Sequence, residues 1–478
     1  MLHRITVLPQ KLHIDVSCGS NLLDALRDAG ILMDAPCGGN GKCGKCRVII
    51  DGEVCLACQT TVDRNMTVFT NNALPDAQIQ LSPLSAPSSP VLAFDIGTTT
   101  VAGYLLDAAT GETLACASAL NPQCAYGADV ISRIQYSVKL SHLPLTEGIR
   151  QCMDDMIRKL STAAGTSPAE INTVSIVGNP AMQQLFLEIQ ADNLAKIPFA
   201  PVLTEAKSVK ASSYLPLLAN ADMHIVPDIS GFVGADTVAC VLSTGLDRSE
   251  DLTLLVDIGT NGEMILGNKH RMAACSTAAG PALEGATIQW GMRAHIGAID
   301  HVWLENGAFR YSVIGGGEAE GICGSGLIDA VAAALDAGLI NERGRIQNEE
   351  RMIRLTDRVV ITQEDIRQLQ QAKGAICAGI HLLADHLGIA LDDIRQVLLA
   401  GAFGSYMDPK SACRIGLLPE ELAERITPVG NAAGEGAKQL ALKPKLLGHT
   451  QEIADKAEFL ELASVPGFQR CFARCMRF

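Results

Sequence analysis

The sequence predicts a protein of two parts, a small α+β module followed by a larger α/β region made of two related halves. Three observations support this prediction. The N-terminal residues alternate in hydrophobicity around a cysteine-rich loop, and a short Ser/Pro-rich stretch, SPLSAPSSP, follows them. Beyond that stretch, the strand-and-turn pattern of Leu92–Thr99 recurs at Leu254–Asn261. The boundaries that we expect are 1–81 for the module, 82–90 for the linker, and 91–245 and 246–478 for the two lobes.

The composition is that of an ordinary folded chain with an acidic balance. Its 478 residues allow about three domains, and 48% hydrophobic with 19% charged residues excludes a mainly disordered chain. A formal net charge of −14 gives no electrostatic reason to bind nucleic acid or an anionic membrane. The apolar runs are too short for a transmembrane helix, and the N-terminus lacks the apolar core of a signal peptide. We therefore expect a cytoplasmic protein.

The order of elements in the first module is that of a small sheet with one helix. Ser20 is the expected N-cap of the helix and Gly30 its end, because leucines between them form one apolar face. Alternating apolar residues predict the strands around it. These strands are His3–Leu8, Lys11–Val16, Arg47–Ile50 and Met66–Thr70.

Five of the sixteen cysteines lie between Cys37 and Cys58, and their spacing predicts an iron–sulfur site. The pattern Cys37-x5-Cys43-x2-Cys46 is close to the spacing of plant-type ferredoxins, which use a more distant fourth cysteine. Glycines in this loop allow tight turns and close approach of backbone amides to sulfur. A zinc site is the alternative. Zinc is usually bound by cysteines paired in hairpins, and such pairs would not include Cys37. The fourth ligand is Cys58 or Cys55, and we choose Cys58 because Leu56–Gln59 is similar to the ferredoxin ending.

The two recurring turns each place an aspartate at the end of an apolar strand. Such a carboxylate can hold Mg²⁺ directly or through water, and the glycine after it allows amides to face a phosphate. One such loop is weak support, since similar strings occur in ordinary hairpins, but two with matching flanks favour a nucleotide clamp. The candidate catalytic residues are Asp95 and Asp257, and the candidate phosphate-binding residues are Gly97, Thr98, Thr99, Gly259, Thr260 and Asn261.

A third element, Val397–Gly404, is an apolar strand that runs into a turn of small residues. Gly401 and Gly404 could leave bare backbone for adenosine, although a plain strand-to-helix turn would have the same sequence. With the two loops, this layout resembles the actin, sugar-kinase and heat-shock chaperone ATPase superfamily (ASKHA) over roughly residues 91–478. Ala402 departs from the second glycine of many members. A P-loop ATPase is not indicated, since the Walker lysine loop is missing.

A ferredoxin module joined to such an ATPase resembles the reductive activators of corrinoid-dependent enzymes. Further stretches similar to that family are Asn121–Gln123, Tyr126–Ile134, Val177–Met182, Pro227–Asp236 and Gly321–Asp329. The resemblance implies a β-grasp ferredoxin module followed by a two-lobed α/β, actin-like ATPase with a ribonuclease H-like core. It also implies an enzyme that uses ATP to deliver one electron from a 2Fe–2S cluster, returning the cobalt of a corrinoid protein from inactive Co(II) to Co(I).

The implied cofactors are the cluster, ATP and Mg²⁺. The implied partners are a corrinoid protein or its methyltransferase complex and a low-potential reductant, and a homodimer is compatible with the resemblance. Electron transfer then requires the N-terminal module to swing or dock against its partner.

Other functions remain open at this point. A small-molecule kinase with an iron–sulfur module would use Asp228 or Asp236 as base, although a turn or helix-cap aspartate is the plainer interpretation. An activator of another radical or reductase enzyme would share the ATPase half. A simple electron carrier would leave the ATPase loops idle.

The remaining polar residues carry less information. Glu284 could lie near a metal or be a solvated helix carboxylate. Cys471 and Cys475 are isolated in the sequence, so we expect core or free thiols. Four histidines show no paired metal-ligand spacing of the zinc-protease type and are expected at the surface or in the core. They are His295, His301, His381 and His386.

Overall fold

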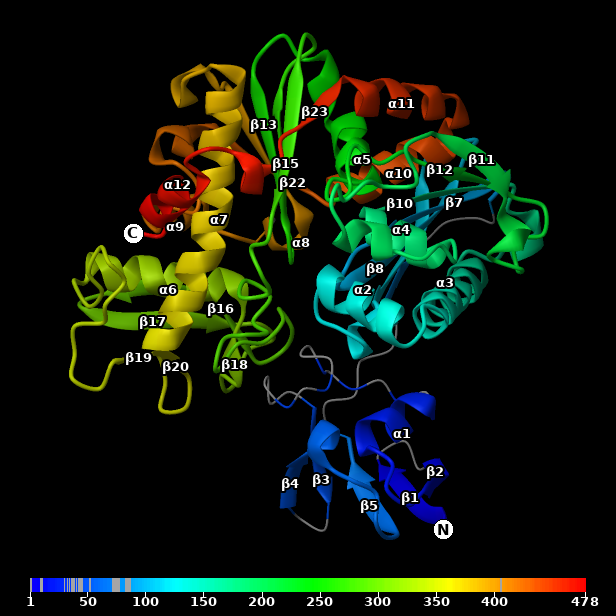
Figure 1. Cartoon of the computed structure of the whole chain (residues 1–478), viewed down its shortest axis with the longest axis horizontal. Helices are drawn as coiled ribbons and strands as arrows, with labels where there is room; N and C mark the ends of the chain where they lie inside the picture. Colours follow the sequence, from blue (N-terminus) through cyan, green and yellow to red (C-terminus); the bar gives the residue numbers. More distant parts are fainter. Residues whose placement is uncertain are drawn as a thin grey trace. The chain divides into compact units, whose positions relative to one another are not determined.

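The structure is a computed structural model, and its chain divides into two compact units (Figure 1). Unit 1 comprises Met1–Val202 and Ser208–His224, and unit 2 comprises Leu203–Lys207 and Ile225–Phe478. The residues described are 2–8, 12–29, 31, 33, 35, 39, 41, 46–50, 53–70, 78–81, 87–404 and 406–478.

Unit 1 begins with a five-stranded sheet in the order β2-β1-β5-β3-β4. Its strands are β1 (Leu2–Leu8), β2 (Leu12–Ser17), β3 (Arg47–Ile50), β4 (Glu53–Leu56) and β5 (Met66–Phe69). β1 pairs with β2 antiparallel and with β5 parallel. One helix, α1 (Leu22–Asp28), buries Leu22, Leu23 and Leu26 in the core of this sheet. The α+β ferredoxin-type arrangement predicted from the sequence is thus present.

The start of α1 differs from the prediction by one residue. Asn21, not Ser20, is the N-cap, and its side chain accepts hydrogen bonds from the amides of Leu23 and Asp24. Asparagine and serine cap helices about equally well, so the local sequence did not discriminate between them. The Asn21 amide also donates to the Cys58 carbonyl at 2.9 Å, a distant contact that fixes the helix start. Gly30 lies outside the described residues.

The second sheet of unit 1 has seven strands in the order β11-β12-β10-β7-β8-β9-β6. β7 pairs with β10 parallel and with β8 antiparallel, and β9 follows β8 antiparallel. β6 adds to the far edge by pairing with β9, so residues 78–81 join this sheet although they precede the Ser/Pro stretch. The strands are β6 (Gln78–Leu81), β7 (Pro90–Ile96), β8 (Thr100–Asp107), β9 (Thr113–Leu120), β10 (Thr173–Gly178), β11 (Lys207–Lys210) and β12 (Asp222–Ile225).

Three helices accompany this sheet: α2 (Val130–Lys139), α3 (Leu143–Ala163) and α4 (Pro180–Phe186). α3 packs on β8 and β9 through an apolar face that includes Ile149, Met153 and Met156. The spacing of these residues places them on one side of the helix. α2 starts with a capping box in which Asp129 and Ser132 bond reciprocally.

Unit 2 contains a six-stranded sheet in the order β22-β21-β13-β14-β15-β23. Its central strand β13 pairs with β14 antiparallel and with β21 parallel, just as β7 pairs with β8 and β10 in unit 1. The internal repeat in the sequence therefore corresponds to two sheets of the same strand order. The strands are β13 (Thr253–Ile258), β14 (Gly262–Gly267), β15 (Met272–Thr277), β21 (Gln396–Ala400), β22 (Ile426–Gly430) and β23 (Ala457–Phe459).

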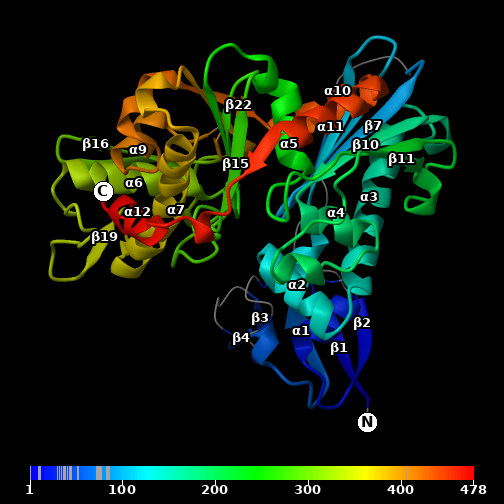
Figure 2. The ribbon, with the colours of Figure 1, turned by 45° about the horizontal axis from the view of Figure 1, so that its top comes forward.

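Long helices cover this sheet. α7 (Gln363–Leu387) packs on β14 and β15, and α12 (Phe468–Cys475) lies against α7 in both views (Figures 1 and 2). α5 (Ala235–Thr244) and α10 (Ala432–Leu442) lie side by side, and Gly436 allows this close approach because a Cβ there would clash with the Ala239 carbonyl oxygen. The other helices are α6 (Gly324–Asp336), α8 (Gly401–Gly404), α9 (Pro409–Arg414) and α11 (Leu447–Lys456).

Two small sheets complete unit 2. The first has the order β17-β16-β18, and the second is the hairpin β19-β20. Their strands are β16 (Ala298–Glu305), β17 (Ala308–Val313), β18 (Gly321–Ile322), β19 (Met352–Arg354) and β20 (Val360–Thr362). Among the residues that the structure describes, no helix has both the length and the apolar character needed to cross a membrane.

Candidate functional site

The cysteine-rich region is described in part. Cys46 is 1% exposed and precedes β3, and its carbonyl accepts a hydrogen bond from the Ala57 amide at 2.8 Å. Cys58 is 6% exposed and lies in a short 3-10 turn over Ala57–Gln59. Cys37 and Cys43 lie outside the described residues. The two described candidate ligands are therefore brought close in the fold by backbone pairing around Ala57.

Cys55 and Cys58 have different surroundings. Cys55 pairs with Val48 across β3 and β4 and packs at the edge of the module's apolar core. Cys58 faces the cysteine loop, since a Cβ on Gly39 would lie 3.8 Å from the Cys58 Cβ. The side-chain amide of Gln59 donates to the Cys58 sulfur at 3.8 Å. Two cysteines held near a loop of glycines, with an amide donor to sulfur, fit a thiolate-bound cluster.

The first phosphate-loop candidate is the turn between β7 and β8. The Gly97 amide donates to the Thr100 carbonyl at 3.0 Å, and a Cβ at Gly97 would lie 2.7 Å from the same oxygen. Only glycine therefore fits this turn. Asp95 is half-buried one residue before the end of β7, and Thr98 and Thr99 are half-buried in the turn.

Two asparagines stabilise this turn through side-chain hydrogen bonds. The Asn121 amide donates to the Gly97 carbonyl at 2.8 Å, and the Asn179 amide donates to the Thr98 hydroxyl oxygen at 3.0 Å. Asn121 is completely buried, as is Arg133, whose guanidinium donates to the Gly127 carbonyl at 2.9 Å. These residues lie in the stretches that carry the family resemblance. Their residue types alone did not predict that they fix the position of this turn.

The second phosphate-loop candidate joins β13 to β14. The Gly259 amide donates to the Asn261 carbonyl at 2.9 Å, which closes a tight turn. Antiparallel pairing sets Asp257 opposite Glu263. The Thr260 hydroxyl donates to the Glu284 carboxylate, so Glu284 contacts this loop. Glu263 was not among the residues predicted for the site, although the hairpin register predicts its position opposite Asp257.

The third element meets the second loop within unit 2. β21 runs parallel to β13 and pairs Ala400 with Asp257, which brings Gly401 to the end of β13. Gly401 has a φ of +89°, and a Cβ there would lie 2.6 Å from Oδ1 of Asp257. The glycine is thus required both by its backbone conformation and by the carboxylate. Gly404 packs against Leu399, where a Cβ would lie 2.9 Å from the leucine Cγ.

Four carboxylates interact around the second loop. Burial raises the pKa of Asp257 to about 6, and a weak bond from the Cys240 thiol opposes this. Burial and the charges of Asp236 and Asp257 raise the pKa of Glu263 well above its ordinary value. Asp228 is 3% exposed, and burial with the charge of Asp236 raises its pKa strongly. Carboxylates that disfavour each other's ionisation suit a divalent cation, which would relieve their repulsion.

The ferredoxin-type module contacts the following part of unit 1 through Arg27 of α1. Its guanidinium donates to the Ala125 carbonyl and lies 5.4 Å from the centre of the Tyr126 ring. Asp24 pairs with the same guanidinium at 2.9 Å, and Arg27 is 7% exposed. The module therefore has a defined polar contact beside the Asn121 segment.

Family models match the chain along most of its length. A model for the 2Fe–2S iron–sulfur cluster binding domain matches residues 5–69. A model for the RACo middle region matches residues 91–249, and one for the C-terminal ASKHA domain of RACo matches residues 251–478.

Individual proteins resemble the chain over most of their own length as well. The corrinoid activation enzyme RamQ of Eubacterium limosum is 32% identical over 95% of both chains. A reductase of the Co(II) methylated amine-specific corrinoid protein from Methanosarcina barkeri is 28% identical over 80% of this chain and 75% of its own. The solved structure of a reductive activator for a corrinoid, iron–sulfur protein has 28% identity and a TM-score of 0.74, covering 100% of this chain and 98% of that one.

Proposed function

The chain belongs to the family of reductive activators of corrinoid proteins, and from this premise we propose how its residues perform the activation. The protein uses ATP to drive one electron from a 2Fe–2S cluster to the cobalt of a corrinoid protein, which changes from inactive Co(II) to Co(I). The observation that carries this function is the presence in one chain of a cysteine module and an ASKHA ATPase, in the arrangement of a known activator.

We assign the cluster to Cys37, Cys43, Cys46 and Cys58. Burial of Cys46 and Cys58 and the approach of Gly39 to Cys58 support this set. Cys55 is the alternative; it lies in β4 opposite Val48, whereas Cys58 lies next to Gly39 of the cysteine loop. When bound, the cluster accepts one electron from a low-potential reductant and releases it to cobalt. Among the described residues, Cys46 and Cys58 are buried, and the side-chain amide of Gln59 donates to the Cys58 sulfur.

We assign nucleotide binding to the two turns and to the α8 region. Gly97, Thr98 and Thr99 of one turn and Gly259, Thr260 and Asn261 of the other supply amides and hydroxyls to phosphates. Gly401 and Gly404 leave their backbone open to the nucleotide. A side chain at either position would clash with its neighbours. Asp95 and Asp257 would hold Mg²⁺, and Asp257 must lose its proton to do so, since burial raises its pKa.

The coupling of ATP to reduction requires two states of the protein that differ in affinity for nucleotide and for the partner. We propose that residues 91–245 and 246–478 form the lobes that bind nucleotide and that the cluster module precedes them. The bounds expected for the module and the linker were 1–81 and 82–90, but residues 78–81 pair with β9 of the following sheet, so the module ends before them. The partner is a corrinoid protein or its methyltransferase complex. We place the reaction in the cytoplasm, because thiolate ligands and a Co(I) product require a reducing compartment.

Anaerobic optical spectroscopy tests this function. The protein is mixed with a Co(II) corrinoid protein and a low-potential reductant, with and without Mg·ATP, and we expect a Co(I) band that grows only with ATP. Asp257→Asn should keep the cluster absorbance and lose the ATP-dependent band. A cluster without any ATP-dependent cobalt reduction would contradict the proposal and favour another enzyme partner or phosphoryl transfer to a metabolite.

A further inference from the structure

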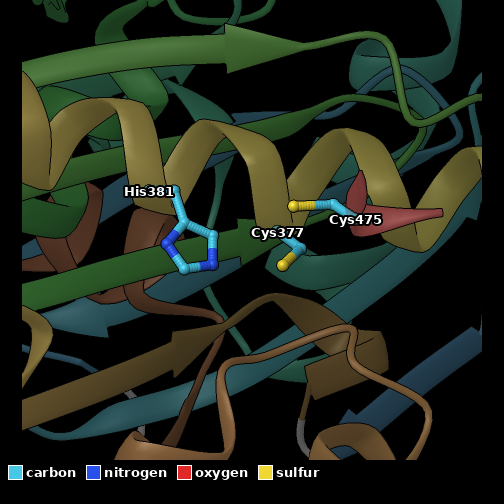
Figure 3. A group of neighbouring side chains, drawn as sticks. All are labelled: Cys377, His381 and Cys475. Atoms are coloured by element: carbon cyan, nitrogen blue, oxygen red, sulfur yellow. The ribbon is translucent and has the colours of Figure 1, made fainter. Parts of the chain in front are cut away.

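The C-terminal cysteines are not isolated thiols in the structure. Cys377 and His381 lie one turn apart on α7, and Cys475 reaches them from α12 (Figure 3). One ligand atom from each residue lies within 4.8 Å of the other two. The expectation of core or free thiols is confirmed, since Cys475 is a buried free thiol, but the sequence did not predict its approach to Cys377 and His381. The sequence alone does not reveal this group of ligands, because α7 and α12 are distant in the chain and meet only in the folded protein.

The donor set is that of a zinc site. Zinc binds cysteine sulfur and histidine nitrogen at about 2.0–2.3 Å in a tetrahedron, which sets ligand atoms about 3.3–3.8 Å apart. The ligand atoms of the three residues lie within 4.8 Å of one another, so side-chain rotation would have to bring them to this spacing. Each helix carries its ligands with a three-residue spacer, Cys377-x3-His381 and Cys471-x3-Cys475. A three-residue spacer puts both side chains of a pair on one face of a helix.

A buried cation lies beside the group. Lys373 is 1% exposed, its ammonium donates to the Arg477 carbonyl, and its charge acts on both Cys377 and Cys475. Cations beside the group would offset the excess negative charge of a site with three thiolates.

Helix α12 packs on α7, with Cys471 and Phe472 against the cluster of Cys377, Ala378 and Cys475. Within α12 only Cys475 is buried, and an eight-residue helix is marginal without tertiary contacts. Gly374 of α7 lies against the next residue, Met476, since a Cβ at Gly374 would lie 3.0 Å from the Met476 Cγ. A metal bridging the two helices would therefore fix the C-terminus on α7.

We propose that α7 and α12 together bind a zinc ion through Cys377, His381 and Cys475, with Cys471 as the fourth ligand. Cys471 lies one helical turn from Cys475, and their thiols interact. The site is structural, because four protein ligands leave no open position for a substrate. None of its ligands is among the predicted cluster cysteines or the predicted nucleotide-binding residues.

Metal analysis of the full-length protein, purified without oxygen, tests this site. We expect about one zinc per chain, measured by mass spectrometry of the elements together with iron. After chelation, zinc chloride should restore that content. Cys377→Ser and Cys475→Ser should each lose the zinc while iron is retained. Cys413→Ser, which removes another buried thiol of unit 2, should keep both metals.

Cobalt(II) in place of zinc gives a second readout that does not depend on any variant. Its addition to the chelated protein should produce ligand-field bands of a tetrahedral thiolate site in a difference spectrum. Two results would overturn the proposal. One is the failure of the wild-type chain to bind zinc or cobalt beyond the iron. The other is a Cys377–Cys475 disulfide, found by alkylation and peptide mass analysis, in protein kept free of oxygen.

Discussion

The carboxylate of Asp257 occupies the space that a side chain at residue 401 would need: a Cβ on Gly401 would lie 2.6 Å from Oδ1 of Asp257. Parallel pairing of β13 with β21 creates this approach by setting Asp257 against Ala400. The aspartate of the second loop and the glycine of the third element are therefore in direct contact.

Gly401→Ala should disable nucleotide binding without affecting the cluster. The added methyl group must displace Asp257, and alanine is also strained at a φ of +89°. A displacement costing about 1.4 kcal/mol would weaken ATP binding tenfold. We expect at least that loss in calorimetric titration with Mg·ATP.

Gly388→Ala is the matched control for this variant. Gly388 also has a left-handed φ, +64°, but a Cβ there meets no atom within 4 Å. It should share the backbone strain and bind ATP like the wild type. Equal affinities for both variants and the wild type would disprove the contact with Asp257 as a determinant of binding.

Asp228 should make the protein less stable as the pH rises. Its pKa is raised by burial and by Asp236, so the native state binds more protons than the unfolded state above about pH 4. The free energy of unfolding attributable to this group therefore falls as pH increases towards the native pKa. Asp228→Asn cannot ionise and should be more stable than the wild type at pH 8, by about 1–3 kcal/mol.

The measurement is thermal and denaturant unfolding of both chains at pH 5 and pH 8 without Mg²⁺. The gain from Asp228→Asn should be smaller at pH 5. Asp222→Asn is the control of opposite sign, because the hydrogen bond from Lys210 lowers the pKa of Asp222. A gain of the same size at both pH values would argue against a titrating Asp228.

The sequence predicted those features that depend on local patterns. Alternating residues gave the strands of the first module, and the repeated strand-and-turn unit gave two sheets of the same order, since period and turn chemistry act over a few residues. Features that depend on long-range packing were missed or left open. Gly401 against Asp257 and Cys475 beside Cys377 arise from strand pairing or helix packing between distant segments. Glu263 opposite Asp257 is a local hairpin contact that the register would have predicted.

The two candidate fourth ligands of the cluster should respond differently to substitution. Cys58→Ser removes a buried thiol that faces the glycine loop, and we expect loss of the visible cluster absorbance and of most of the iron. Cys55→Ser changes a residue that packs beside Val48 and should retain about two irons per chain. If the Cys55 variant lost the cluster and the Cys58 variant kept it, our ligand assignment would be wrong.

Release of Arg27 should accelerate electron delivery if the cluster module must leave its contact with the Tyr126 segment to reach cobalt. A cation–π contact of this kind contributes about 0.5–1 kcal/mol, so Arg27→Ala should raise the rate of ATP-dependent Co(I) formation about two- to fivefold. Tyr126→Phe keeps the aromatic face and should react like the wild type. The rates are compared at equal iron content and saturating ATP. A slower Arg27→Ala variant would mean that the contact holds the module in the geometry used for transfer, because loosening it would then lower the fraction of molecules able to deliver the electron.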